Sequence, residues 1–259
     1  NGLNTAVGYA AGALMTTGIK NTIMGGLAGD ALTTGVENTA IGYFALSTED
    51  TGNYNVAIGK GALAVLNFDG NGYNTAVGYN AGSAATSGVQ NTLIGGLAGD
   101  ALTTGTANVA VGYLALSTED AHGNNVAIGN SALKMQDAGA DAYNVAVGYN
   151  AGIAVSTGIR NILIGANAGD ALTTGDFNVA IGHEALSTED AHGRNVAVGY
   201  RALRDMNAGS DGYSVAIGYV AGENITTGPN NVIIGGLAGD ALTTGANNIA
   251  IGVGALGAE

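Results

Sequence analysis

Short apolar segments recur along this chain at a nearly constant spacing. Each segment starts with Asn, or once with Ser214, ends with Gly, and holds small or apolar residues between them, as in Asn4–Gly8. The segments start 17, 17, 17 and then 19 residues apart, and this series of spacings repeats every 70 residues. The composition of the segments and the Asn and Gly that flank them predict short β-strands, and no helical periodicity follows them.

A strand every 17 to 19 residues leaves no room for a helix between strands, but it suits one coil of a parallel β-solenoid. We therefore predict an all-β protein of about 15 coils, stacked at about 4.8 Å into a rod on the order of 70 Å long. The whole chain is expected to form one repeat domain. Its 70-residue super-repeats are 4–73, 74–143, 144–213 and, in part, 214–259.

Three residue types hold constant positions in the repeat, and each has a structural explanation. Gly supplies a corner where φ is positive or space is short. Ala stands where a larger group would clash, and stacked Asn side chains can form hydrogen bonds along the coils. These positions begin with Asn4, Gly8 and Ala11, and recur at Asn74, Gly78, Ala81, Asn144, Gly148 and Ala151.

Both faces of the predicted strands are apolar. In the first strand Thr5 and Val7 share one face and Ala6 points the other way. We expect the first face to fill the coil and the middle residue, small in most coils, to face outward. If each of fifteen middle residues hides about 40 Å² against a partner, the gain is on the order of 15 kcal/mol. The sequence thus predicts an obligatory oligomer and leaves the number of chains open.

The units NTAVGYAAG and NVAIGKGAL resemble the head repeats of YadA-like trimeric autotransporter adhesins and the NTAIG-type repeats of bacteriophage tail-fibre proteins. The resemblance covers essentially the whole chain and rests on the Asn-x-Ala-Val/Ile-Gly core. It implies a left-handed β-roll, a side-by-side homotrimer and a role in adhesion or fibre building. The adhesin repeat is shorter than 17 residues, and its neck and stalk have no counterpart here, nor has the chaperone domain found beside the tail-fibre repeats.

Composition and charge exclude several classes of protein. Gly accounts for 46 residues, Pro for one and Cys for none, so any core must be thin and filled by small side chains. The formal net charge of −13 is opposite to that of nucleic-acid binders. Apolar runs fall short of the roughly 18 residues that a membrane helix needs. We expect no nucleic acid, no membrane insertion and no cofactor.

A glycine-rich stretch, GGLAGDALTTG, resembles a phosphate loop and recurs in the super-repeats, once as the near copy GANAGDALTTG. It lacks the Lys-Ser/Thr and the following helix that phosphate binding needs. Its aspartates recur every fourth coil, too far apart to share a calcium ion, and we expect them to cap backbone amides. They are Asp30, Asp100, Asp170 and Asp240.

Acidic pairs occur in the tetrapeptide STED, which recurs in three super-repeats, and a His follows two of the pairs. Such a set can ligate a divalent ion or act in acid–base chemistry. We interpret the STED segments as solvated loops and keep a metal site as the alternative. Without a nucleophile or a cleft we expect no enzyme. The alternative ligands are Glu119, Asp120, His122, Glu189, Asp190 and His192.

The 19-residue coils carry variable loops that each end in a tyrosine, Tyr73, Tyr143 or Tyr213. Loops on a rigid scaffold commonly carry recognition. Two readings stay open: the tyrosines contact a glycan or a cell-surface receptor, or each one packs over the next coil.

Together these patterns predict a non-enzymatic, adhesive rod segment of an extracellular, cell-surface or virion fibre. One alternative is the subunit of an extracellular filament that stacks end to end, since strand edges can template further strands. An ice-binding solenoid is less favoured, because the rows of Thr pairs at Thr16–Thr17 and Thr33–Thr34 are broken in the next coil by Asp50.

Overall fold

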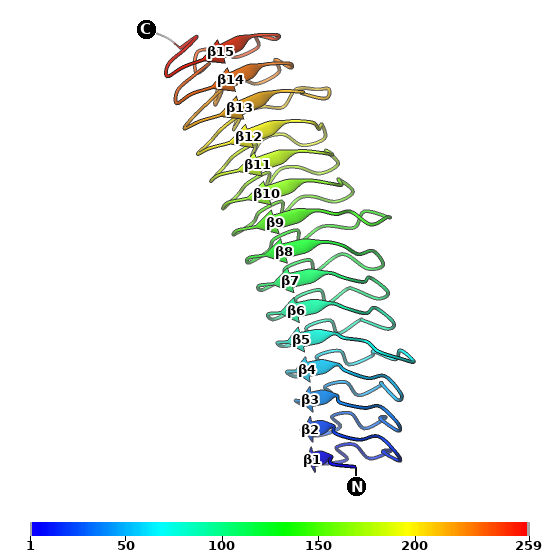
Figure 1. Ribbon diagram of the computed structural model, residues 1–259. Helices are drawn as coiled ribbons and strands as arrows, with labels where there is room; N and C mark the ends of the chain where they lie inside the picture. Colours follow the sequence, from blue (N-terminus) through cyan, green and yellow to red (C-terminus); the bar gives the residue numbers. More distant parts are fainter. Residues whose placement is uncertain (1, 258–259) are drawn as a thin grey trace. The chain divides into compact units, whose positions relative to one another are not determined.

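The computed structural model describes residues 2–257, which form fifteen three-residue strands, all parallel and in chain order, and no helix (Figure 1). The predicted all-β parallel solenoid of fifteen coils is confirmed. Contacts divide the chain into two compact units, Asn1–Asn125 and Val126–Glu259. No helix among the described residues could cross a bilayer. The end of the last predicted super-repeat, 258–259, lies outside the described range.

Seven strands lie in the first unit and eight in the second. The first unit contains β1 (Thr5–Val7), β2 (Thr22–Met24), β3 (Thr39–Ile41), β4 (Val56–Ile58), β5 (Thr75–Val77), β6 (Thr92–Ile94) and β7 (Val109–Val111). The second contains β8 (Val126–Ile128), β9 (Val145–Val147), β10 (Ile162–Ile164), β11 (Val179–Ile181), β12 (Val196–Val198), β13 (Val215–Ile217), β14 (Val232–Ile234) and β15 (Ile249–Ile251).

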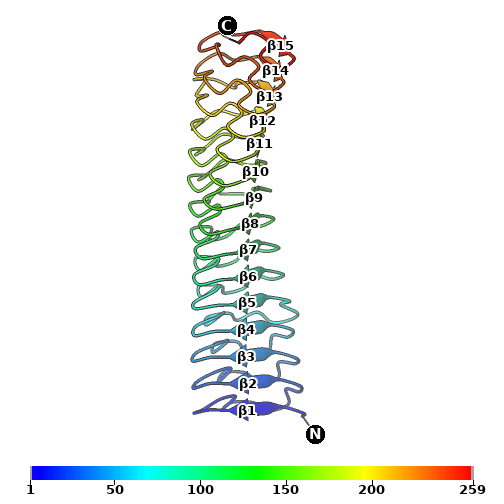
Figure 2. The same cartoon turned by 90° about the vertical axis from the view of Figure 1, so that its left-hand side faces the viewer.

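Within each unit the strands pair so that every position of the repeat stacks on the same position of the next coil (Figure 2). Thr5 of β1 lies opposite Thr22 of β2, for example. The longer coils keep this register, because their two additional residues enter the loop before the strand. These loops project further than those of neighbouring coils, ahead of β5, β9 and β13 (Figure 1).

The corner glycine after each strand is required for two reasons. Gly148 has φ 144°, a conformation that side chains with a Cβ rarely adopt. A Cβ on this residue would also lie 2.5 Å from the carbonyl oxygen of Gly165 in the next coil. Neighbouring coils therefore approach closely enough to pair only because the corner carries no side chain.

The constant asparagines form a ladder of hydrogen bonds in each unit. The Oδ1 atom of Asn161 accepts the backbone N–H of Asn178 in the next coil at 2.9 Å. Its Nδ2 donates to the Gly175 carbonyl at 2.8 Å, at the turn that ends its own coil. The side chain is fully buried. Asn161 thus holds both the turn of its own coil and the start of the next strand, whereas Asn55, which opens a 19-residue coil, donates to the Asn53 carbonyl instead.

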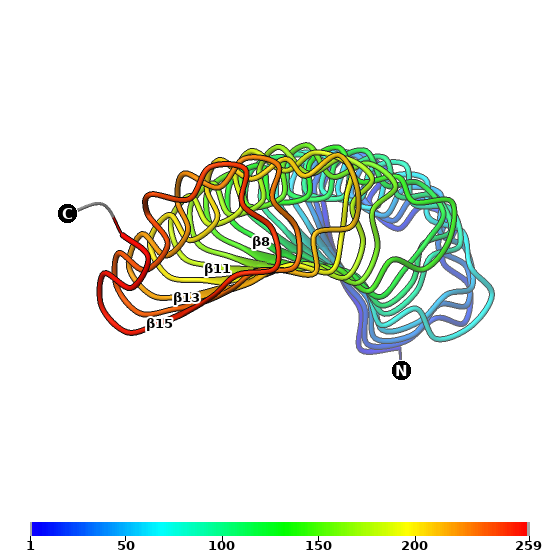
Figure 3. The ribbon, with the colours of Figure 1, turned by 90° about the horizontal axis from the view of Figure 1, so that it is seen from above.

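The two strand faces point opposite to the sequence expectation. The middle residue of the strand fills the coil: Ile23, Ala40 and Ala57 are fully buried. The first and third residues, such as Val56 and Ile58, point outward. Seen from above, each coil is a narrow loop with its strand along one side, which leaves little interior width (Figure 3). The expectation failed because the small middle residues reflect this narrow interior and not a tight external contact.

Size compensation across the coil explains which middle residues are large. Leu46, fully buried, lies four residues after the corner of its coil, and the middle strand residue there is Ala40. In the preceding coil the equivalent of Leu46 is Gly29, and the middle residue is Ile23. A Cβ on Gly29 would lie 3.4 Å from the Cδ1 of Ile23. In the coils of β2 and β3 one of the two positions is therefore large. In the coil of β5 both are small, Ala76 and Gly82, and the side chain of Leu93 from the next coil lies beside Gly82.

Candidate functional site

An uncharged surface, the outward face, is formed by the first and third residues of the strands. Every such position is Thr, Val, Ile or Met. In the second unit most of these side chains are half-buried between neighbouring strands, and Ile162 and Ile217 reach 40% exposure. A continuous, partly exposed apolar surface of this kind often marks an interaction site.

A tyrosine column borders the outward face, formed by the residues that directly follow the corner glycines. In the second unit the rings of His183, Tyr200 and Tyr219 stack with centroids 5.6 and 5.3 Å apart. Most of the column's tyrosines remain half-exposed despite stacking. Its aromatic members are Tyr9, Tyr43, Tyr79, Tyr113, Tyr149, His183, Tyr200 and Tyr219.

In the STED loops the glutamates are buried, contrary to the prediction that these loops are solvated, whereas the threonines remain exposed. The Oε1 atom of Glu49 accepts the Gly52 N–H at 2.7 Å, and its Oε2 accepts the Phe68 N–H, in the loop of the next coil, at 3.1 Å. Burial raises the pKa of the Glu49 carboxyl, while these hydrogen bonds act to lower it. The prediction is wrong for the glutamates, because their carboxylates accept backbone N–H groups of the loops. The fully buried glutamates are Glu49, Glu119 and Glu189, whereas Asp120 and Asp190 are exposed.

The two histidines lie beside these buried glutamates. Glu189 accepts the N–H of His192 on Oε1 at 3.1 Å and the N–H of Ala208 on Oε2 at 3.2 Å. The Nδ1 atom of His192 is 3.2 Å from Oε1. Ligand atoms of Glu189, Asp190 and His192 lie within 4.8 Å of one another. The alternative metal ligands are thus together, but both Glu189 oxygens already accept backbone N–H groups, which an anchoring role explains.

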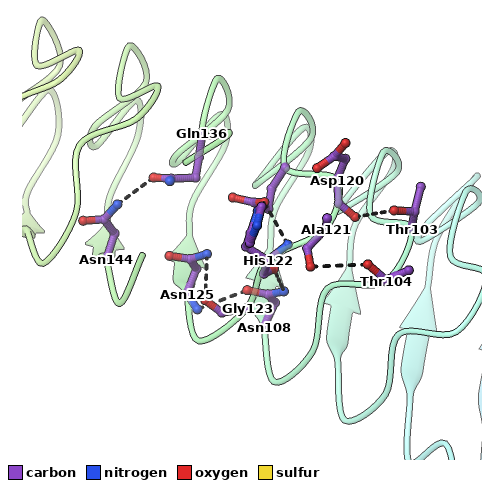
Figure 4. Close-up of polar contacts among 11 residues, drawn as sticks. Thr103, Thr104, Asn108, Asp120, Ala121, His122, Gly123, Asn125, Gln136 and Asn144 are labelled. Atoms are coloured by element: carbon purple, nitrogen blue, oxygen red, sulfur yellow. Dashed lines mark hydrogen bonds and ion pairs between the residues drawn. The ribbon is translucent and has the colours of Figure 1, made fainter. Parts of the chain in front are cut away.

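The equivalent loop in the first unit brings Glu119, Asp120 and His122 together in the same way (Figure 4). The preceding coil holds its backbone: the hydroxyl of Thr103 donates to the Asp120 carbonyl at 2.8 Å. The side chain of Asn108, in the same coil as His122, donates to the His122 carbonyl at 3.0 Å. Thr16 likewise donates to the carbonyl of Thr33. These threonine hydroxyls donate hydrogen bonds to carbonyls of the next coil, so they do not favour the ice-binding alternative.

The aspartates of the glycine-rich stretches were predicted to cap backbone amides, but within the described range they accept no hydrogen bond from the amides of neighbouring residues. Nearby N–H groups already donate to carbonyls, as Thr33 does to Asp50 at 2.8 Å. Burial raises the pKa of the Asp100 and Asp170 carboxyls, and their own backbone N–H groups lower it. No helix follows the stretches in the described range. The aspartates whose Oδ1 is buried without a hydrogen-bond partner include Asp30, Asp100, Asp170 and Asp240.

The loop tyrosines Tyr73, Tyr143 and Tyr213 are 53, 51 and 55% exposed. The ring of Tyr73 stacks on Tyr54 of the preceding coil, with centroids 5.2 Å apart and planes 4° apart. The guanidinium of Arg194 lies 5.7 Å from the ring centroid of Tyr213. These two rings therefore pack along the stack and still leave half of their surface for another molecule.

Comparison with known proteins gives no relative from which a role could be transferred. No family model, no curated protein and no solved structure matches this chain.

Proposed function

We propose that this chain is a non-enzymatic, adhesive segment of an extracellular, cell-surface or virion fibre, in which identical chains pack side by side through their outward faces. The observation that carries the proposal is the uncharged outward face. Three copies and a left-handed roll are taken from the resemblance to adhesin and tail-fibre repeats.

The area of the outward face supports a stable assembly. The second unit offers two outward side chains on each of its eight strands. At about 40 Å² hidden per side chain, it covers about 640 Å², and the seven strands of the first unit add about 560 Å². At about 25 cal/mol/Å² these areas give on the order of 30 kcal/mol per chain, above the roughly 4–15 kcal/mol that association costs.

The partner that best fits this face is another copy of the chain. Both copies carry the same rows, mostly Val and Ile with Thr in the first unit, at a spacing of about 4.8 Å, so the rows of one copy can pack between those of the other. No charged residue on the outward face would need a partner of opposite charge. Half-exposed tyrosines along its border match the composition of protein interfaces.

The projecting loops supply the adhesive part of the proposal. These side loops, 67–72, 137–142 and 207–212, extend beyond the neighbouring coils on a rigid stack (Figure 1). Such loops accept sequence variation without disturbing the strands. We assign them contact with a glycan or another cell-surface receptor.

Charged substitutions on the outward face test the assembly. In the double variant Ile181→Lys/Val196→Lys, two lysines on adjacent strands would have to be buried without partners. We expect wild type to have a mass in light scattering that is a multiple of 25.2 kDa. The double variant should have the mass of one chain and an unchanged circular dichroism spectrum. Thr188→Lys, on an exposed loop, is the matched control and should assemble normally. A single-chain mass for wild type would refute the assembly.

Shortening the side loops tests the adhesive role separately. Deleting two residues from each loop (70–71, 140–141 and 210–211) makes the 19-residue coils equal to the others. We expect this variant to assemble with the same number of chains as wild type. It should no longer bind the glycans or host cells that wild type binds. Equal binding by both proteins would remove the loops from the adhesive role.

A further inference from the structure

The tyrosine column is interrupted once in every four coils by a residue without a large side chain. We call each interruption a notch. The first unit has notches at Gly26 and Gly96, and the second unit has them at Ala166 and Gly236.

Nothing inside the chain requires the glycine at a notch. Gly96 does not have the positive φ that favours glycine. A Cβ on this residue would lie 3.5 Å from the ring of Tyr113, which is an ordinary van der Waals contact. The corner glycines differ, since there both backbone and space exclude a side chain. An omission without an internal cause indicates that something outside the chain uses the space.

The outward face is exposed beside three of the four notches. Ile94, the third residue of β6, lies two residues before Gly96 and is 39% exposed. In the next coil Val111 lies two residues before Tyr113, and its exposed fraction is lower than that of Ile94. Met24 and Ile164 beside the notches at Gly26 and Ala166 are likewise 42% and 37% exposed, whereas Ile234 beside Gly236 is half-buried. An exposed apolar floor beside a notch suits an aromatic side chain.

A half-exposed tyrosine stands at the opposite border of the outward face, one coil before each of three notches. Tyr73 precedes β5, and Gly96 follows β6. When parallel chains pack side by side, the border before the strands of one chain meets the border after the strands of its neighbour. The height difference is one coil, about 4.8 Å, which a tyrosine side chain can span. The pairs are Tyr73 with Gly96, Tyr143 with Ala166, and Tyr213 with Gly236.

An outward face built of Thr, Val, Ile and Met does not fix the relative height of two chains. A shift by one coil would lose the contacts of one coil and would match Val and Ile rows again, as in weakly specified strand registers. We propose that the notches are a register key for a second copy of this chain: each accepts a tyrosine from Tyr73, Tyr143 or Tyr213 and penalises shifts of one to three coils. The inference rests on the proposed side-by-side assembly, and it assigns these tyrosines to a copy of the chain and not to a glycan.

Distances between copies test the register directly. The chain has no Cys, so Ser210→Cys on an exposed loop gives one spin label per chain. Pulsed dipolar spectroscopy should find one narrow distance between copies in this background. Filling the notches should add further distances, because each shift displaces a label by about 4.8 Å along the stack. The filled variant is Gly26→Tyr/Gly96→Tyr/Ala166→Tyr/Gly236→Tyr.

Two further variants make the result specific. Lys60→Tyr/Asn130→Tyr adds tyrosines to the same column outside the notches and should keep the single distance. Tyr73→Ala/Tyr143→Ala/Tyr213→Ala removes the inserted side chains and should add distances, as filling does. A single, unchanged distance in both the filled and the tyrosine-free variants, at unchanged mass, would overturn the register key alone. Several distances in the Ser210→Cys background would overturn it too, whereas a mass of 25.2 kDa there would refute the assembly itself.

Discussion

The asparagine ladder should carry much of the stability of each unit, and Asn161→Ala tests this. The substitution removes two hydrogen bonds, to the Asn178 N–H at 2.9 Å and to the Gly175 carbonyl at 2.8 Å. Asn161 and Asn178 are fully buried, so water cannot replace the lost side chain.

The magnitude follows from the groups left behind. An unpaired buried donor or acceptor costs about 1–3 kcal/mol, and Asn161→Ala leaves one of each. We therefore expect the free energy of unfolding to fall by about 4 kcal/mol. This is a large part of the roughly 5–15 kcal/mol that stabilises a typical domain.

Urea unfolding followed by circular dichroism, at one fixed protein concentration, measures the loss. Asn130→Ala is the matched control, because Asn130 is exposed and lies outside the ladder. Its effect should stay within about 0.5 kcal/mol. A loss below about 1 kcal/mol for Asn161→Ala would show that the ladder is not a main source of stability.

Three other changes have defined outcomes. Ser214→Asn restores the one position where the ladder lacks Asn, and the added hydrogen bond should raise Tm by about 2–4 °C in a thermal scan. Gly148→Ala should cost more than about 3 kcal/mol in urea unfolding, because its Cβ meets the Gly165 carbonyl; Gly139→Ala, with φ 68° and nothing within 4 Å, should cost about 1 kcal/mol. The raised pKa of Glu49 means that the folded state binds its proton more tightly than the unfolded state. Stability from this group is therefore full below its unfolded pKa and falls as pH rises through the folded pKa. The free energy of unfolding, measured from pH 4 to 7, should therefore fall with pH in wild type and fall less in Glu49→Gln. Equal slopes in the two proteins would contradict this prediction.

The spacing of the repeat was enough to predict the coils but not which strand face lies inside. Period-two alternation separates the faces without orienting them. The signal that orients them is the size of two positions read together. Ala40 occurs with Leu46, and Ile23 with Gly29, as expected for side chains that share one interior layer.

The buried glutamates were missed because a charged residue in a loop normally faces solvent. Their position in the chain contains a clue. Each STED coil directly precedes a 19-residue coil, whose additional residues have no equivalents in the neighbouring coils. Amides in such a loop need another acceptor, and Phe68 and Ala208 find it in Glu49 and Glu189.

The most direct test of the proposed assembly is a crystal structure of the purified chain. We expect identical chains side by side, with Val179, Ile181 and their equivalents in van der Waals contact with Val and Ile of a neighbouring copy. Outward faces that meet only solvent in the crystal, in a protein of single-chain mass in solution, would contradict it.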